Sequence, residues 1–162
     1  FQQVAYSLQT TLNHALTRNG APGMFLTLFY ALIDSAHKKL SFCSAGHEPM
    51  ILYRQAIRQT EIIKGAQGIP LGLFEDSAYE TCEIPFEEGD LLLLISDGVR
   101  ELRNPKGEEF GMERLKKIIQ EKAEKGENSE QIIHELFQEM HHYQKGIPAH
   151  DDRTLMCVRF SG

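Results

Sequence analysis

The stretch LLLLISDGVRELRNPKGEEFG, residues 91–111, opens with five aliphatic residues and passes directly into an acidic turn. Because no polar residue alternates within Leu91–Ile95, the run predicts a strand that is buried on both faces. Asp97 follows after one serine, where the strand would leave the core, and Gly98 lets the backbone turn because glycine readily takes a positive φ. A carboxylate at the end of a core strand is costly unless a cation or a hydrogen-bond donor meets it. The sequence therefore raises the question of what Asp97 meets.

A second acidic turn precedes the last strand-like segment of the chain. Asp151 and Asp152 come directly before the run RTLMCVRF, residues 153–160. Antiparallel core strands can bring the end of one strand beside the start of another, however distant in sequence. Carboxylates gathered in this way, with no thiolate and no histidine pair nearby, favour a hard cation: Mg²⁺, Mn²⁺ or Ca²⁺. Asp97 and Asp151 are therefore candidate metal ligands, and the alternative is that both belong to ordinary solvated turns.

The composition is typical of a globular protein and disfavours several classes. The chain has 162 residues, of which 41% are hydrophobic and 25% charged, enough for one domain over residues 1–162. A formal charge of −6 without a basic cluster argues against nucleic-acid binding. No apolar run approaches the roughly 18 residues that span a membrane. The three isolated cysteines, Cys43, Cys82 and Cys157, are expected to be reduced core thiols of a cytoplasmic protein.

The order of the expected elements indicates the fold class. An apolar repeat predicts a helix from the start of the chain to Asn19-Gly20, and two more helices follow position 110, the second after a capping-box pattern from Asn128 to Gln131. Residues 65–74, rich in glycine, are expected to form a loop. Strands are expected at 24–34, 40–45, 50–54, 60–64, 79–86, 91–95 and near the C-terminus. Segregated runs of this kind favour an α+β fold with helices packed on antiparallel sheets.

Other candidate residues are weaker. His47 follows a strand and a glycine, so it could face a cleft, although a surface turn is the commoner setting for such a histidine. His150 adjoins Asp151 and could tune it. The pair His141-His142 ends an amphipathic helix, where cations are favoured without any ligand role. No GK[ST] follows the glycines and no serine sits in a nucleophile elbow, so P-loop and serine-hydrolase chemistry are disfavoured.

Five ordered segments resemble one family. The first, GDLLLLISDGVRELRNPKGEEFGMERL (89–115), looks like the signature of bacterial SpoIIE-type phosphatases, a branch of the PPM family of metal-dependent protein serine/threonine phosphatases. The others are MFLTLFYALID (24–34), LSFCSAGHEPMILYR (40–54), GIPLGLF (68–74) and DDRTLMCVRF (151–160). The resemblance covers nearly the whole chain, and a chance match of five ordered motifs is hard to credit.

The resemblance implies an antiparallel β-sandwich flanked by helices, with two Mn²⁺ or Mg²⁺ ions at one edge. It assigns Asp97 to the metal-ligating Asp-Gly turn and Asp151 to the last metal ligand, with Asp152 in support. Two acidic motifs that the family places upstream are absent, and the sequence starts with Phe1 inside a helical pattern. We therefore expect a piece of a longer protein that lacks the first strands and, by itself, binds metal weakly and turns over poorly. Arg100 stands where relatives carry a small threonine, as a surface variation or as a cation beside the metal site.

The implied activity is hydrolysis of phosphoserine or phosphothreonine by a metal-activated water, without a phosphoenzyme. The implied substrate is a phosphorylated anti-sigma-factor antagonist of the STAS type, and a sensory or response-regulator domain is expected upstream. The main alternative is an inactive phosphatase-like module that acts by partner binding or as a homodimer. A Ca²⁺-binding β-sandwich without enzymatic activity is disfavoured, because its loops would need more clustered carboxylates.

Overall fold

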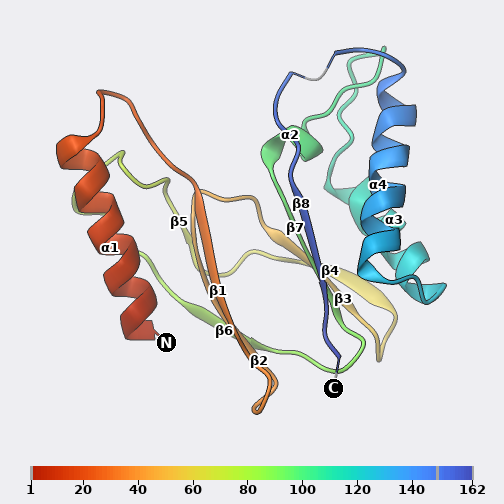
Figure 1. The fold of residues 1–162 in the computed structure, drawn as a ribbon, viewed down its shortest axis with the longest axis horizontal. Helices are drawn as coiled ribbons and strands as arrows, with labels where there is room; N and C mark the ends of the chain where they lie inside the picture. Colours follow the sequence, from red (N-terminus) through yellow and green to blue (C-terminus); the bar gives the residue numbers. More distant parts are fainter. Residues whose placement is uncertain (1, 149, 162) are drawn as a thin grey trace. The chain divides into compact units, whose positions relative to one another are not determined.

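The computed structural model describes residues 2–148 and 150–161 (Figure 1). The chain forms two compact units. The first unit contains Phe1–His47 and Lys64–Phe86, and the second contains Glu48–Ile63 and Glu87–Gly162. Each unit combines helices with a mainly antiparallel sheet, so the predicted α+β class is confirmed.

The first unit is a four-stranded sheet with one long helix. The helix α1 is Gln2–Asn19, and the strands are β1 (Leu28–Asp34), β2 (Lys39–Ala45), β5 (Gln67–Gly68) and β6 (Cys82–Pro85). β1 and β2 form the predicted antiparallel hairpin, in which Leu28 pairs with Ala45, and β6 pairs with β2. Leu12 and Leu16 of α1 pack against a small core of Ala45, Leu71 and Tyr79.

Three predictions in the first unit have wrong boundaries, one of them the strand expected at 79–86, which spans only Cys82–Pro85. The strand expected at 24–34 begins only at Leu28, because Gly23 takes a positive φ of 81° and Leu26 makes an isolated bridge to Leu71 instead. The loop expected at 65–74 contains the short strand β5, which pairs in parallel with β2. Buried Asn13 fixes this segment, since its amide donates to the Phe74 carbonyl at 2.8 Å. Its Oδ1 accepts from the Gly72 amide at 2.8 Å.

The second unit is an antiparallel sheet in the order β4-β3-β7-β8. Its strands are β3 (Met50–Arg54), β4 (Gln59–Ile63), β7 (Leu91–Ile95) and β8 (Leu155–Arg159). Three helices belong to it: α2 (Asp97–Arg100), α3 (Met112–Glu124) and α4 (Ser129–Gln144). Four of the five side chains of β7 are at most 3% exposed, which confirms the prediction of a strand buried on both faces.

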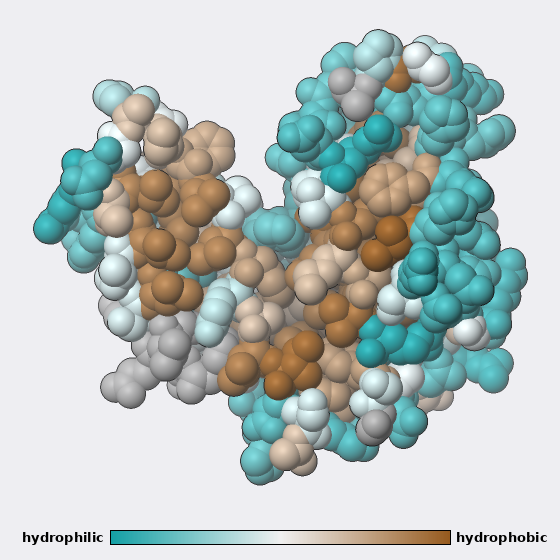
Figure 2. Space-filling view, viewed as in Figure 1, coloured by the Kyte–Doolittle hydropathy of each residue, from teal (hydrophilic) through white to brown (hydrophobic). Residues whose placement is uncertain are grey.

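One face of this sheet carries the main apolar core of the unit. Side chains that alternate along β3 and β7 meet the apolar stripes of α3 and α4, among them Tyr53, Leu93, Leu115, Ile119 and Leu136. Hydrophilic side chains gather over α3 and α4 on the side seen in Figure 2, as expected for amphipathic helices. The predicted capping box is confirmed: Asn128 Oδ1 accepts from the Gln131 amide, and Gln131 Oε1 accepts from the Asn128 amide, both at 2.9 Å.

The three cysteines are free thiols. Cys43 is buried, whereas Cys82 and Cys157 are half-buried. Burial raises the pKa of the Cys43 and Cys157 thiols, which keeps both groups neutral near pH 7. Among the described residues, no helix combines the length and the apolar character that crossing a membrane requires.

Candidate functional site

The pairing of β7 with β8 brings the two acidic turns together. Ile95 at the end of β7 pairs with Leu155 at the start of β8. One residue further, the Ser96 amide donates to the Thr154 carbonyl at 3.0 Å. The Ser96 hydroxyl accepts from the Thr154 amide at 2.9 Å and donates to the Asp152 carbonyl at 3.0 Å. Ser96 therefore ties the turn after β7 to the turn before β8.

Gly98 is required here by close approach of the two turns. It lies inside the single helical turn α2 and is not among the glycines with positive φ, so the backbone turns here without a left-handed glycine. A Cβ at position 98 would lie 2.3 Å from the Asp152 carbonyl oxygen and 3.2 Å from the Asp151 Cβ. The backbone of the second turn thus packs directly on the residue that follows Asp97.

The two candidate carboxylates meet backbone amides and solvent. Both Asp97 and Asp151 are exposed. Neither carboxylate therefore incurs the desolvation cost of a buried charge. Asp97 Oδ1 accepts from the Gly98 amide at 2.9 Å, and Asp151 Oδ1 accepts from the Asp152 amide at 2.7 Å. Among the described residues, no hydrogen bond or ion pair engages Oδ2 of either side chain.

This donor set suits one hard, hydrated cation. Mg²⁺ commonly takes one or two protein carboxylates and keeps several waters, and the two adjoining turns offer two exposed carboxylates. Within residues 2–148 and 150–161, no group of three or more His, Cys, Asp or Glu side chains is arranged to hold a metal ion. The described residues therefore do not supply the ligands of a complete two-ion centre.

Arg100, at the end of α2, is engaged by carboxylates. Its Nε donates to Glu48 at 3.1 Å and its Nη2 to Glu101 at 2.5 Å, while Glu109 lies 3.7 Å from Nη1. Partial burial by itself would lower the pKa of the guanidinium, but the hydrogen bonds to Glu48 and Glu101 outweigh it, and the net shift is upward. Arg100 is therefore a fixed positive charge one helical turn from Asp97.

A small cavity lies beside the second turn. Its volume is about 160 Å³, and its lining includes Gly98, Arg103, Gln144, His150 and Asp151. Gln144 is buried and accepts from Arg153 at 3.1 Å, which holds the end of α4 against the segment before β8. His150, the neighbour of Asp151 in the sequence, lines the same cavity, and its expected influence on Asp151 stays a prediction.

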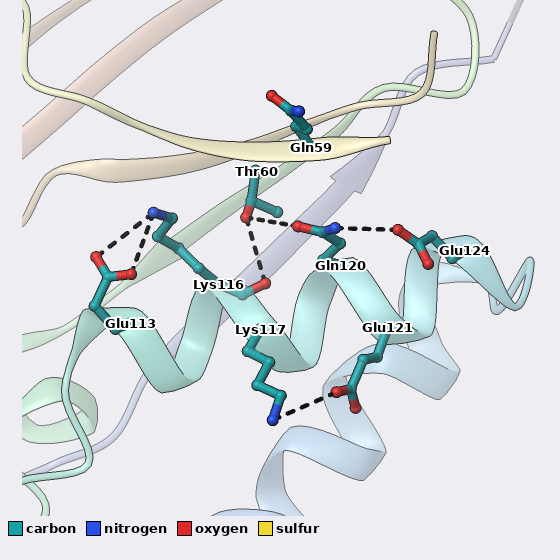
Figure 3. Close-up of a pocket in the computed structure, with 8 residues that line it drawn as sticks. All are labelled: Gln59, Thr60, Glu113, Lys116, Lys117, Gln120, Glu121 and Glu124. Atoms are coloured by element: carbon teal, nitrogen blue, oxygen red, sulfur yellow. Dashed lines mark hydrogen bonds and ion pairs between the residues drawn. The ribbon is translucent and has the colours of Figure 1, made fainter. Parts of the chain in front are cut away.

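A larger groove of about 570 Å³ lies between β4 and α3, away from both acidic turns (Figure 3). Four of its five charged side chains form ion pairs, Lys116 with Glu113 and Lys117 with Glu121, and the fifth, Glu124, accepts a hydrogen bond from Gln120. Size alone therefore does not make this groove the candidate site.

The other candidate histidines are His47 and the pair His141-His142. His47 belongs to the first unit, where its ring centroid lies 5.7 Å from that of Phe29 in a tilted contact. His141 and His142 are exposed in the last turn of α4. The sequence left the role of Arg100 open. Its partner Glu48 lies 52 residues away in the chain, so no local pattern predicts this ion pair.

Comparison with known proteins gives a consistent result. Phosphoserine phosphatase RsbU of Bacillus subtilis is 31% identical over 150 residues, which cover 91% of this chain and 43% of RsbU. The chain thus spans less than half the length of that relative. The SiaA-PP2C domain of Pseudomonas aeruginosa has the same fold, with a TM-score of 0.80 and 20% identity over 96% of this chain and 61% of that one.

A structure of RsbX in complex with magnesium also shares the fold. Its TM-score is 0.59 and its identity is 20%, over 93% of this chain and 62% of that one. The family model for Stage II sporulation protein E (SpoIIE) matches residues 4–161, almost the whole sequence. The chain therefore belongs to the SpoIIE family.

Proposed function

We propose that this chain is the catalytic part of a metal-dependent protein serine/threonine phosphatase. The observation that carries the proposal is the junction of the two turns, where Ser96 bonds Thr154 and Asp152 and where Gly98 packs on Asp151. Membership of the SpoIIE family and the likeness to a phosphoserine phosphatase support it.

In this proposal, Asp97 and Asp151 hold the metal. Each carboxylate uses Oδ1 to accept the N–H of the next residue, and among the described residues Oδ2 has no hydrogen-bond or ion-pair partner, so it would be available to a cation. Ser96 keeps the two turns in register, and Gly98 allows their close approach. A divalent ion bound there supplies an activated water and neutralises charge on a phosphoryl group. Mn²⁺ and Mg²⁺ both suit carboxylate oxygens, and a second ion would need ligands beyond the described residues.

The finer parts of the proposal rest on the resemblance to SpoIIE-type phosphatases. We infer that the substrate is a phosphorylated STAS-domain antagonist of an anti-sigma factor and that the enzyme acts in sigma-factor regulation. A regulatory domain in the same polypeptide and a cytoplasmic location belong to the same proposal. The three free thiols agree with a reducing compartment.

An inactive, partner-binding module is the second candidate. It is favoured by one observation, that the described residues provide fewer than three potential ligands in one place. The two candidate functions differ in their need for a divalent ion. A phosphatase requires the ion for turnover, whereas a partner-binding module does not require it.

The test uses the full-length protein and a phosphoserine peptide. We expect release of inorganic phosphate that depends on Mn²⁺ or Mg²⁺ and that falls by at least about 100-fold in Asp97→Asn and Asp151→Asn, because both replacements remove a metal ligand. Glu113→Gln, on the exposed side of α3, is the matched control and should keep full activity. Undiminished activity in both aspartate variants would refute the metal assignment, and a wild-type protein without metal-dependent turnover would favour the binding module.

A further inference from the structure

The charge cluster around Arg100 bears directly on the metal site. Asp97 and Arg100 are the first and last residues of the single turn α2. Residues three apart on a helical turn project from the same side, so an aspartate and an arginine in this spacing ordinarily form an ion pair. Such a pair would place a permanent cation on the carboxylate that the proposed function assigns to a divalent ion.

The structure shows Arg100 bound elsewhere. Three glutamates from three segments engage its guanidinium: Glu48 just before β3, Glu101 at the end of α2, and Glu109 before α3. In the described part of the chain, no ion pair joins Arg100 to Asp97 or to Asp151. The guanidinium is thus paired with these glutamates and with neither of the candidate carboxylates.

Glu48 is the most effective of the three partners. Its side chain is 19% exposed, against 55% for Glu101 and 39% for Glu109. A pair that is sheltered from water is less screened, so it fixes the arginine more firmly than an exposed pair does. Glu48 also belongs to the segment that enters β3, so it offers the guanidinium a partner outside α2 and the loop that follows it.

We propose that Glu48 is a positioning residue that draws Arg100 away from Asp97 and so keeps this carboxylate available for a divalent cation. The inference rests on the proposed function, because it needs Asp97 to be a metal ligand. Without Glu48, Arg100 keeps only its two more exposed partners, Glu101 and Glu109, which hold it less firmly. Its guanidinium can then approach Asp97 and compete with the incoming ion for the same oxygen atoms. Loss of Arg100 as well removes the competitor.

The experiment measures Mn²⁺ affinity, not turnover, in the full-length protein by isothermal titration calorimetry and by the electron paramagnetic resonance signal of unbound Mn²⁺. We expect Glu48→Gln to weaken Mn²⁺ binding about two- to fivefold, the range for a partly exposed charge. The double variant Glu48→Gln/Arg100→Met should return to wild-type affinity. The loss in Glu48→Gln should shrink at 1 M salt, which a merely structural role would not produce.

Two controls separate the possible failures. Glu113→Gln, which removes a glutamate that pairs with Lys116 on α3, should leave the Mn²⁺ affinity unchanged. Asp97→Ala should weaken it strongly. Wild-type affinity in Glu48→Gln, or a double variant as weak as Glu48→Gln, overturns the role of Glu48 while the metal site stands. Wild-type affinity in Asp97→Ala overturns the proposed function and this inference with it.

Discussion

The two ends of β7 carry two aspartates in opposite settings. Asp90, just before the strand, is 1% exposed. Its Oδ1 accepts from the Gln55 amide at 2.9 Å, and its Oδ2 accepts from Arg54 and from the Glu87 amide, both at 3.1 Å. Asp97, just after the strand, is exposed and accepts only from its neighbour Gly98 among the described contacts.

The difference separates a structural carboxylate from a candidate functional one. Asp90 has its charge compensated inside the protein, and its backbone also bonds Phe160 and Glu87. Asp97 is held in place by the backbone while its outer oxygen is left for a ligand. A binding site needs groups whose hydrogen bonds are incomplete before the ligand arrives. The few described partners of Asp97 therefore favour a binding role, whereas the full set of partners at Asp90 indicates a structural one.

The largest effect on folding is expected at the buried end. Asp90→Ala would leave two backbone amides without an acceptor and Arg54 without its buried partner. We expect a loss of about 3 kcal/mol in the free energy of unfolding, somewhat reduced because Arg54 also pairs with Glu61. Urea unfolding followed by circular dichroism measures it. A loss below about 1 kcal/mol would mean that the buried contacts of Asp90 contribute little to stability, so that the two ends of β7 do not differ in this respect.

Gly98→Ala is expected to have the next largest effect. A methyl group 2.3 Å from the Asp152 carbonyl oxygen forces the two turns apart. We expect a loss of about 1–3 kcal/mol in stability, typical of overpacking, together with weaker Mn²⁺ binding. Thermal unfolding and Mn²⁺ titration of the same sample test both effects. Normal metal affinity in this variant would show that the close approach of the turns is not needed for the site.

Ser96→Ala removes the hydroxyl that bridges the two turns. The Thr154 amide loses its acceptor and the Asp152 carbonyl loses its donor, although both atoms can reach solvent because both residues are exposed. We expect a loss of about 1 kcal/mol in the free energy of unfolding. Ser96→Thr keeps the hydroxyl and should recover most of that loss; equal losses in both variants would argue against the hydroxyl bridge.

The smallest effect on stability is expected at Asp97 itself. Asp97→Ala changes an exposed side chain whose described contact is to the next amide, so the free energy of unfolding should change by at most about 0.5 kcal/mol. Metal protection should vanish, however: we expect Mn²⁺ to raise the melting temperature of the wild type by mass action and not to raise that of the variant. An unaltered Mn²⁺-induced shift in Asp97→Ala would remove Asp97 from the site.

Local sequence patterns predicted most of the elements of this fold. The hydrophobic run of β7, the hairpin of β1 and β2, and the capping box at Asn128 each depend on residues close together in the chain. The boundaries that failed at 24–27 and within 65–74 depend on the bridge from Leu26 to Leu71 and on the pairing of β5 with β2. Those contacts join distant segments, which no local pattern encodes.

The sequence by itself determined which residues could bind a hard cation, because a carboxylate beside an apolar, strand-like run can be recognised from the residue types and their order. Only the tertiary structure decided that the turns of Asp97 and Asp151 adjoin, that Gly98 serves close approach, and that Arg100 is bound by Glu48. The physical reason is that antiparallel pairing and ion pairing act through space. Their partners are chosen by the packing of the whole sheet and not by neighbours in the chain.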